Sequence, residues 1–427
     1  MRGYRSVELT DIASIFLAVY YTWYYLPFMR ATFQSSLYKN IFFGCFAFGA
    51  ALLTVARLKH NNMTITFAHW RSVLIPVIPY MMFMTVLYLL DVGDASGHIR
   101  VSFTFWGTAI IYYLFSFNKE AQARFGKYLL LLFCVTVITS TIGVFVDNSA
   151  ARAIANASQK EDAIARDYEL MRKNISSIYL FQSIVIFVPV TVMMLRYRRR
   201  PMAGAFLLVF IVLAVLKASF TISLLVLIAG GYLALISNRR VPVMIILTLC
   251  LVALVILPLD TIFELFAGVI PNHYISTRLE EIATFLSQRG AQGDLQLRMQ
   301  CYQFSLHTFM EHPFGTGPWY SYIIGDHGIG FHSEILDDLA RYGFAALVFY
   351  LFFFCEYFHL LRSQWMKINL SCVAFPVCAS YFAFLLLNIG FRSGDESVFM
   401  LYILPAVPEI LIQSRKRREV MIEKGAV

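Results

Sequence analysis

One histidine stands at the head of a short amphipathic pattern, GFHSEILDDLARYG, which covers residues 330–343. Three-and-four spacing gives this pattern an apolar face with His332, Ile335, Leu336 and Leu339, and a charged face with Glu334, Asp337, Asp338 and Arg341. The positive end of a helix dipole favours a neutral imidazole, and a neutral imidazole can accept a proton from a hydroxyl. We therefore expect His332 to be either a base or a packed helix cap, and the acidic face to be either its partner or a solvated surface.

A second helix must lie just before this histidine. The segment DLQLRMQCYQFSLHTFMEHPFGTGP, residues 294–318, has apolar residues at helical spacing. The expected apolar face comprises Leu297, Cys301, Phe304, Leu306 and Phe309, and Arg298 sits near the start of the helix. Gly315 and Gly317 predict tight turns after it. We interpret His312, which precedes a proline, and His327 as structural residues.

These polar elements belong to a chain with the composition of a membrane protein. Of its 427 residues, 59% are hydrophobic and only 14% are charged, whereas soluble domains average about a quarter charged. Lipid replaces water around most of such a surface, so the chain is predicted to be an all-α polytopic membrane protein. Six of the seven cysteines fall in apolar runs and Cys301 lies in the polar segment, so we expect no disulfide.

About twelve transmembrane helices are predicted, because each span needs about 20 mainly apolar residues. They cover residues 11–28, 40–57, 72–90, 101–117, 127–146, 176–195, 202–216, 219–236, 241–259, 342–361, 369–389 and 397–413. The basic clusters RYRRR, NRR and RKRR each adjoin an apolar run. This placement is typical of cytoplasmic loops and not of a nucleic-acid groove, so we expect cytoplasmic termini and no nucleic-acid partner.

This topology divides the chain into three parts. Residues 1–259 carry spans 1–9, with an outer loop at 147–175. Residues 260–341 form one large extracytoplasmic loop between spans 9 and 10, far longer than ordinary connections and therefore expected to be functional. Residues 342–427 carry spans 10–12 and a basic cytoplasmic tail.

The order of motifs in the large loop resembles the O-antigen ligase and polymerase superfamily, which includes the Wzy-type polymerases. Members are similar in having twelve spans, a GT-C-like architecture and one large outer loop late in the chain. That loop carries an arginine on a helix, a proline-glycine turn and a histidine element that enters a span. Here these are Arg298, PFGTGP and HSEILDDLARYG. The resemblance covers nearly the whole chain through its topology.

The resemblance implies transfer of a glycan from an undecaprenyl-diphosphate carrier to an acceptor hydroxyl, on the outer face of the bacterial inner membrane. Fixed cations would stabilise the leaving diphosphate, a role for Arg298 and Lys217, with Arg278 and Arg392 as further candidates. Arg278 could instead pair with a neighbouring glutamate, and Arg392 could be an interface anchor. The family places a basic residue beside a serine before a mid-chain span, and Lys217 matches that position only with a displacement.

His332 would orient or deprotonate the acceptor hydroxyl. Glu334 and Asp338 are predicted acceptor contacts, and Trp319 and Tyr320 could stack on sugar rings. We expect no metal and no cofactor, because the chain lacks paired metal-ligand spacing and cations already serve the diphosphate. The implied partners are lipid-linked oligosaccharides as donor and acceptor, membrane lipid, a chain-length regulator and a flippase.

Three functions stay open. A polymerase joins two lipid-linked repeat units, whereas a ligase moves the finished glycan to lipid A-core. Ligases of this superfamily more often have asparagine after the histidine, and Ser333 therefore favours a polymerase. A transporter of the same lipid-linked sugar would be expected to show repeats and charges inside its spans, which are nearly free of charge here.

Overall fold

The computed structural model describes residues 8–60, 106–146, 165, 168–176, 184–197, 201–218, 221–237, 267–269, 276–277, 279–280, 283–284, 293–317, 328–388 and 398–423. Every regular element within these ranges is helical, which confirms the predicted all-α class. The predicted spans at 72–90 and 241–259 lie outside the described residues, and the number of spans therefore stays a prediction.

The helices of the first half are largely those that the apolar runs predict. They are α1 (Leu9–Tyr25), α2 (Pro27–Thr32), α3 (Ser36–His60), an apolar helix at Trp106–Phe115, α7 (Lys119–Val146), η2 (Val185–Phe187), α11 (Val188–Arg196), α12 (Pro201–Ala218) and α13 (Thr221–Ile236). The second half contains α17 (Gly293–Glu311), α18 (Glu334–Tyr342), α19 (Phe344–Met366), η3 (Ser371–Val373), α20 (Ala374–Leu387), the π-helical turn η4 (Phe399–Ile403) and α22 (Leu404–Glu423).

Three of these helices, α3, α7 and α19, are long and apolar enough by themselves to cross a membrane. Shorter apolar helices correspond to five further predicted spans, at Trp106–Phe115, Val185–Arg196, Pro201–Leu216, Val226–Ile236 and Ser371–Leu387. Many large apolar side chains on the long helices stay exposed, as expected where lipid and not protein covers them.

Aromatic rings and small residues hold the bundle together. α1 packs on α3 at Gly49, where a Cβ atom would overlap the Leu17 side chain. The Tyr20 and Phe46 rings meet edge to face with centroids 4.9 Å apart, a favourable geometry for aromatic pairs. Gly126 plays the same part between α7 and α22, because a side chain there would press on Ala406. The helices can therefore approach closely without a strong hydrophobic drive in lipid.

Two basic residues near predicted inner span ends contact groups on other predicted spans. Arg57, at the end of α3, donates to the Tyr113 carbonyl at 2.6 Å, and Lys367 pairs with Glu409 at 3.7 Å. From the predicted outer side, the Asn174 side chain accepts from the Phe28 amide at 3.3 Å. Each contact lies near span ends that the sequence-based topology places at the same membrane face, and the topology itself stays a prediction.

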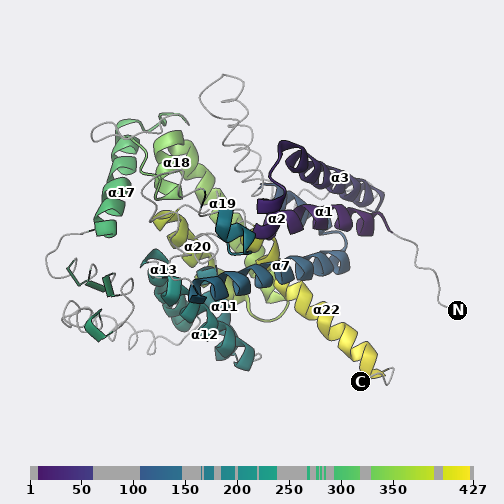
Figure 1. Cartoon of the computed structure of the whole chain (residues 1–427). Coiled ribbons are helices and arrows are strands. Elements are labelled where there is room, and N and C mark those ends of the chain that lie inside the picture. Colours follow the sequence, from purple (N-terminus) through teal and green to yellow (C-terminus); the bar gives the residue numbers. More distant parts are fainter. Residues whose placement is uncertain are drawn as a thin grey trace.

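The two loop helices, α17 and α18, lie together at the upper left of Figure 1, and α22 ends at the lower right. α18 runs directly into α19 through Gly343, which has a φ of 59°. The loop is thus anchored at the end of a membrane-type helix, as predicted for the histidine element.

Candidate active site

α18 begins at Glu334, and Ser333 is its N-cap. The Ser333 hydroxyl accepts a hydrogen bond from the Leu336 amide at 3.1 Å, and the serine is fully buried. The helix is therefore capped by a serine, the residue type that best satisfies a free N-terminal amide. The expectation that His332 might itself cap the helix is wrong. His332 precedes the cap and is left available for another role.

The backbone before His332 is pressed tightly against α17. A Cβ atom at Gly330 would overlap the Cys301 carbonyl of α17, so only glycine fits there. Phe331 follows with a φ of 55°, a left-handed conformation that is strained for an aromatic residue. This turn directs the chain from the surface of α17 into α18 and fixes the position of the histidine between them.

α17 meets this loop with small polar residues and not with its large apolar ones. Cys301, Ser305 and Thr308 are buried, whereas Leu297 and Leu306 are exposed. The Thr308 hydroxyl bonds both the amide and the carbonyl of Gly328, each at 2.8 Å. The helix was predicted correctly, and Cys301 of its expected apolar face is buried. The burial of Ser305 and Thr308 in place of Leu297 and Leu306 was not predicted, because hydropathy does not reveal hydrogen bonds to a loop backbone.

The His332 ring is held by one nitrogen. Its Nδ1 lies 2.8 Å from the Gly330 carbonyl. A carbonyl can only accept, so Nδ1 carries the proton and, in the neutral ring, Nε2 keeps its lone pair. The half-buried ring therefore presents a hydrogen-bond acceptor away from the loop that holds it. This is the arrangement required of a group that orients or deprotonates a hydroxyl.

A hydrogen-bonded chain links this histidine to a buried carboxylate. The Ser305 hydroxyl donates to Asp337 Oδ1 at 2.6 Å and accepts from the Gly330 amide at 2.9 Å. Asp337 is 1% exposed. The amide and the carbonyl of Gly330 belong to successive peptide groups joined at its Cα. The carboxylate and the hydroxyl therefore fix the backbone of the residue whose carbonyl accepts the hydrogen bond from His332 Nδ1.

The charged face of α18 is buried and not solvated. Asp338 Oδ2 accepts from the Tyr350 hydroxyl of α19 at 2.7 Å, and Oδ1 pairs with Arg341 at 3.3 Å. The Arg341 guanidinium also lies over the Phe331 ring, 5.2 Å from its centroid. Glu334 is buried as well, and its amide donates to the Asn388 carbonyl at 3.0 Å. The acidic residues thus join α18 to α19 and to the end of α20.

Arg298 occupies the first part of α17, one turn before the residues that hold the histidine loop. It hydrogen-bonds Tyr302, whose hydroxyl donates to the Leu387 carbonyl at 2.7 Å. Burial raises the pKa of the Tyr302 phenol, and the positive charge of Arg298 opposes that rise. Burial also raises the pKa of the Cys301 thiol; Asp337 adds to the rise and Arg298 opposes it. Cys301 therefore lies within the fields of both Arg298 and Asp337.

The glycine turn after α17 fastens the opposite end of α18. Gly315 and Gly317 have φ values of 89° and 90°, which confirms the tight turns expected there. The Gly317 amide donates to the Arg341 carbonyl at 2.9 Å, and the Phe344 amide donates to the Pro313 carbonyl at 2.9 Å. The first bond satisfies a carbonyl at the end of α18, and the second satisfies an amide at the start of α19; neither group has a partner inside its own helix. Arg298 and His332 are thus carried by two helices with fixed mutual positions.

Residues 203–351 match the protein family described as O-antigen ligase. The matched segment runs from α12 into α19 and includes Arg298, the glycine turn and the histidine element just described. This match supports the resemblance to the O-antigen ligase and polymerase superfamily that the motifs predict. A search of curated proteins found no match.

Lys217, the third predicted catalytic residue, lies in the last turn of α12. Its backbone is therefore at the end of a span, as predicted, whereas the position of its side chain is outside the description. Arg278, Arg392, Trp319, Tyr320 and His327 also lie outside the described residues. Their roles stay predictions.

Four residues around the histidine loop were not predicted to be site residues from the sequence: Tyr302, Ser305, Asp337 and Tyr350. Each of them hydrogen-bonds a residue on another element: for example, the Ser305 hydroxyl donates to Asp337, and the Tyr350 hydroxyl donates to Asp338. One signal was present, because Tyr302 and Ser305 follow Arg298 at i+4 and i+7 and so share its helix face. A serine on the same helix face as a predicted catalytic arginine is therefore a candidate site residue.

Proposed function

We propose that the chain is a polysaccharide polymerase, a metal-independent glycosyltransferase. It would transfer a glycan from undecaprenyl diphosphate to a hydroxyl of another lipid-linked repeat unit, on the outer face of the bacterial inner membrane. The observation that carries this proposal is the His332 ring, whose Nδ1 is tied to the Gly330 carbonyl. This bond leaves Nε2 as an acceptor beside the helix that bears Arg298.

The proposed step is a substitution at the anomeric carbon of the donor. The acceptor oxygen forms a bond to that carbon while the bond from carbon to diphosphate oxygen breaks. The hydroxyl proton passes to His332 Nε2, and undecaprenyl diphosphate departs with the bonding electron pair. Arg298 and Lys217 would counter the charge that develops on the diphosphate, a form of stabilisation often worth 10²–10³ in rate per donor. Arg278 and Arg392 are further candidates for this role.

We propose fewer residues as acceptor contacts than the sequence suggested. Glu334 stays a candidate to bind acceptor hydroxyls, together with Trp319 and Tyr320 as stacking surfaces for sugars. Asp338 already has one carboxylate oxygen on Tyr350 and the other on Arg341. We assign Asp338 to holding α18 in place. A chain-length regulator and a flippase are proposed protein partners, because repeat units must reach the outer face before they are joined.

A ligase is the second candidate, and the description of the matched family favours it. The residue after the histidine does not separate the two, because Ser333 is buried and caps α18. Its identity therefore has a structural cause. Both candidates use the same donor and the same leaving group, and they differ only in the acceptor.

The surface glycan of a strain that lacks the gene separates the candidates. Loss of a polymerase leaves a single repeat unit on the surface, whereas loss of a ligase leaves long glycan stranded on its lipid carrier. We expect single repeats, restored to long chains by the wild-type gene and not by the His332→Ala variant. Carrier-bound long glycan would establish the ligase instead, and unchanged glycan would reject both.

A further inference from the structure

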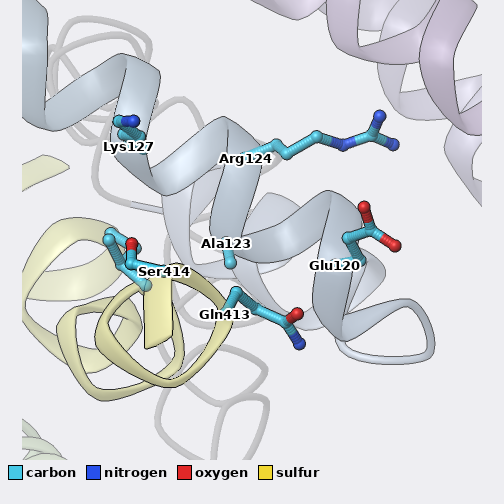
Figure 2. A pocket seen from close by; sticks show the side chains of 7 residues that line it. Glu120, Ala123, Arg124, Lys127, Gln413 and Ser414 are labelled. Atoms are coloured by element: carbon cyan, nitrogen blue, oxygen red, sulfur yellow. The ribbon is translucent and has the colours of Figure 1, made fainter. Parts of the chain in front are cut away.

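A small pocket lies between α7 and α22, far along the chain from the candidate active site. Its volume is about 200 Å³. Figure 2 shows α7 contributing Glu120, Ala123, Arg124 and Lys127, and α22 contributing Gln413 and Ser414. The buried Ala123 methyl is part of an apolar wall, and the other labelled side chains are polar. Nothing in the proposed transfer reaction uses this pocket.

The pocket has an unbalanced positive charge at one end. Lys127 makes no ion pair with any residue that the structure describes. Arg124 forms an ion pair outside the pocket with Asp11 on α1, at 2.9 Å. In Figure 2, Lys127 and Ser414 lie toward one end of the pocket, and Glu120 and Gln413 toward the other. An ammonium and a hydroxyl at one end can hold a phosphate, and a carboxylate and an amide at the other can hold hydroxyl groups.

The same face of α7 continues into lipid. Lys127 is followed at helical spacing by Leu131, Ile138 and Ile142, which are 61%, 50% and 58% exposed. These side chains form an apolar stripe on a helix long enough to cross a membrane. A molecule whose polar part occupies the pocket can therefore lay an acyl chain along α7. A soluble anion has no acyl chain that could contact this apolar stripe.

The flanking charge favours an anionic ligand over a zwitterionic one. α22 continues past Ser414 with the exposed residues Arg415 and Lys416. Basic residues beside a membrane attract anionic headgroups. Among the described residues that line the pocket, Glu120 is the one with an acidic side chain. It suits a headgroup with hydroxyls, because a carboxylate accepts their hydrogen bonds.

We propose that this pocket binds the headgroup of an anionic glycerophospholipid, with the phosphate on Lys127 and Ser414 and the acyl chains along the apolar stripe of α7. The headgroup hydroxyls would reach Gln413 and Glu120. The lipid would bridge the start of α7 and the second half of α22, two helices that also pack together at Gly126. The site is independent of the transfer reaction.

Native mass spectrometry of the purified full-length chain in detergent tests the site. Phosphatidylglycerol, phosphatidylcholine and phosphatidylethanolamine would be titrated separately against the wild type and the Lys127→Gln variant. We expect tighter retention of phosphatidylglycerol by the wild type and about fivefold weaker retention by the variant, the effect of one lost cation near a membrane surface. Lys59→Gln, an exposed lysine in the last turn of α3, is the matched control and should bind as the wild type does.

Equal retention of the three lipids, or equal loss in both lysine variants, would overturn the proposal. Tighter retention of phosphatidylethanolamine would reject the anionic ligand. Inorganic phosphate is added in a separate arm. If it displaces phosphatidylglycerol at equal concentration, the pocket binds soluble phosphate and the lipid assignment is wrong. Thermal unfolding of both variants checks that Lys127→Gln remains folded.

Discussion

At the scale of single residues, the site depends on how one imidazole is held. The Gly330 carbonyl accepts a hydrogen bond from His332 Nδ1, and the Gly330 amide donates a hydrogen bond to the Ser305 hydroxyl. Ser305 in turn donates to Asp337. Ser305 and Asp337 are positioning residues, because they act on the acceptor hydroxyl only through His332.

Replacement of Ser305 by alanine leaves two buried polar groups unsatisfied, the Gly330 amide and Asp337 Oδ1. The expected cost is about 1–3 kcal/mol in the free energy of unfolding. Because the histidine loop is then less well fixed, kcat should fall while KM for the lipid-linked substrate stays near its wild-type value. Steady-state kinetics and thermal unfolding would measure the two effects. Ser363→Ala, on α19 at an exposed position, is the control. A change in KM alone would contradict a positioning role.

Asp338 gives a second prediction at this scale. Its carboxylate and Arg341 are 8% and 2% exposed, so Asp338→Asn leaves a buried guanidinium without its counter-charge. Removal of one partner of a buried pair typically costs about 3–5 kcal/mol. The ion pair of Asp11 with Arg124 is much more exposed, and Asp11→Asn should cost less than about 1 kcal/mol. Denaturation in detergent compares the two, and equal losses would show that the α18 pair is not a buried anchor.

At the scale of elements, α17 and α18 are fixed by glycines that permit close backbone contact. Gly330 lies against the Cys301 carbonyl, and Gly315 lies against the Arg341 carbonyl. The glycine turn and the histidine loop therefore fasten α18 at both of its ends. The contact distances leave no room for a side chain at either position.

Gly330→Ala should displace the histidine loop from α17 and abolish most of the transfer activity. The physical reason is steric, since the new methyl group would overlap the Cys301 backbone. Gly44→Ala on α3 is the matched control, because a Cβ atom there meets nothing within 4 Å. That change should leave activity intact and could slightly stabilise the helix. Surface-glycan length in a complemented strain is the measurement, and wild-type length with Gly330→Ala would refute the packing argument.

The sequence predicted the helices at this scale better than their faces. Periodicity located α17, and the glycine pattern located its turns. The sequence could not reveal that Ser305 and Thr308 are buried while Leu297 is exposed. The two hydroxyls are buried because they hydrogen-bond backbone groups at Gly328 and Gly330. Likewise, the sequence left open whether the acidic face with Asp337 and Asp338 is solvated or a partner of His332. They are buried because Ser305, Arg341 and Tyr350 satisfy them, and two of those partners come from other helices.

At the scale of the whole molecule, the loop helices α17 and α18 lie at the end of α19, one of the membrane-type helices of the bundle. Composition predicted a helical membrane protein, and the described helices agree. The predicted count of twelve spans and the cytoplasmic termini stay predictions. The family match joins the mid-chain helices to the loop in one segment. Among the described helices, the matched segment comprises α13, α17, α18, most of α12 and the start of α19.

The most direct test is glycan transfer by the purified chain in lipid vesicles supplied with one defined lipid-linked repeat unit. We predict lengthened glycan with the wild type, a loss of about 10²–10³ in rate with Arg298→Ala, and a loss of about 10²–10⁴ with His332→Ala. His312→Ala and Arg172→Ala, at exposed positions of the same residue types, should retain activity. Wild-type lengthening by the Arg298 and His332 variants would contradict the assignment of the reaction to these two side chains.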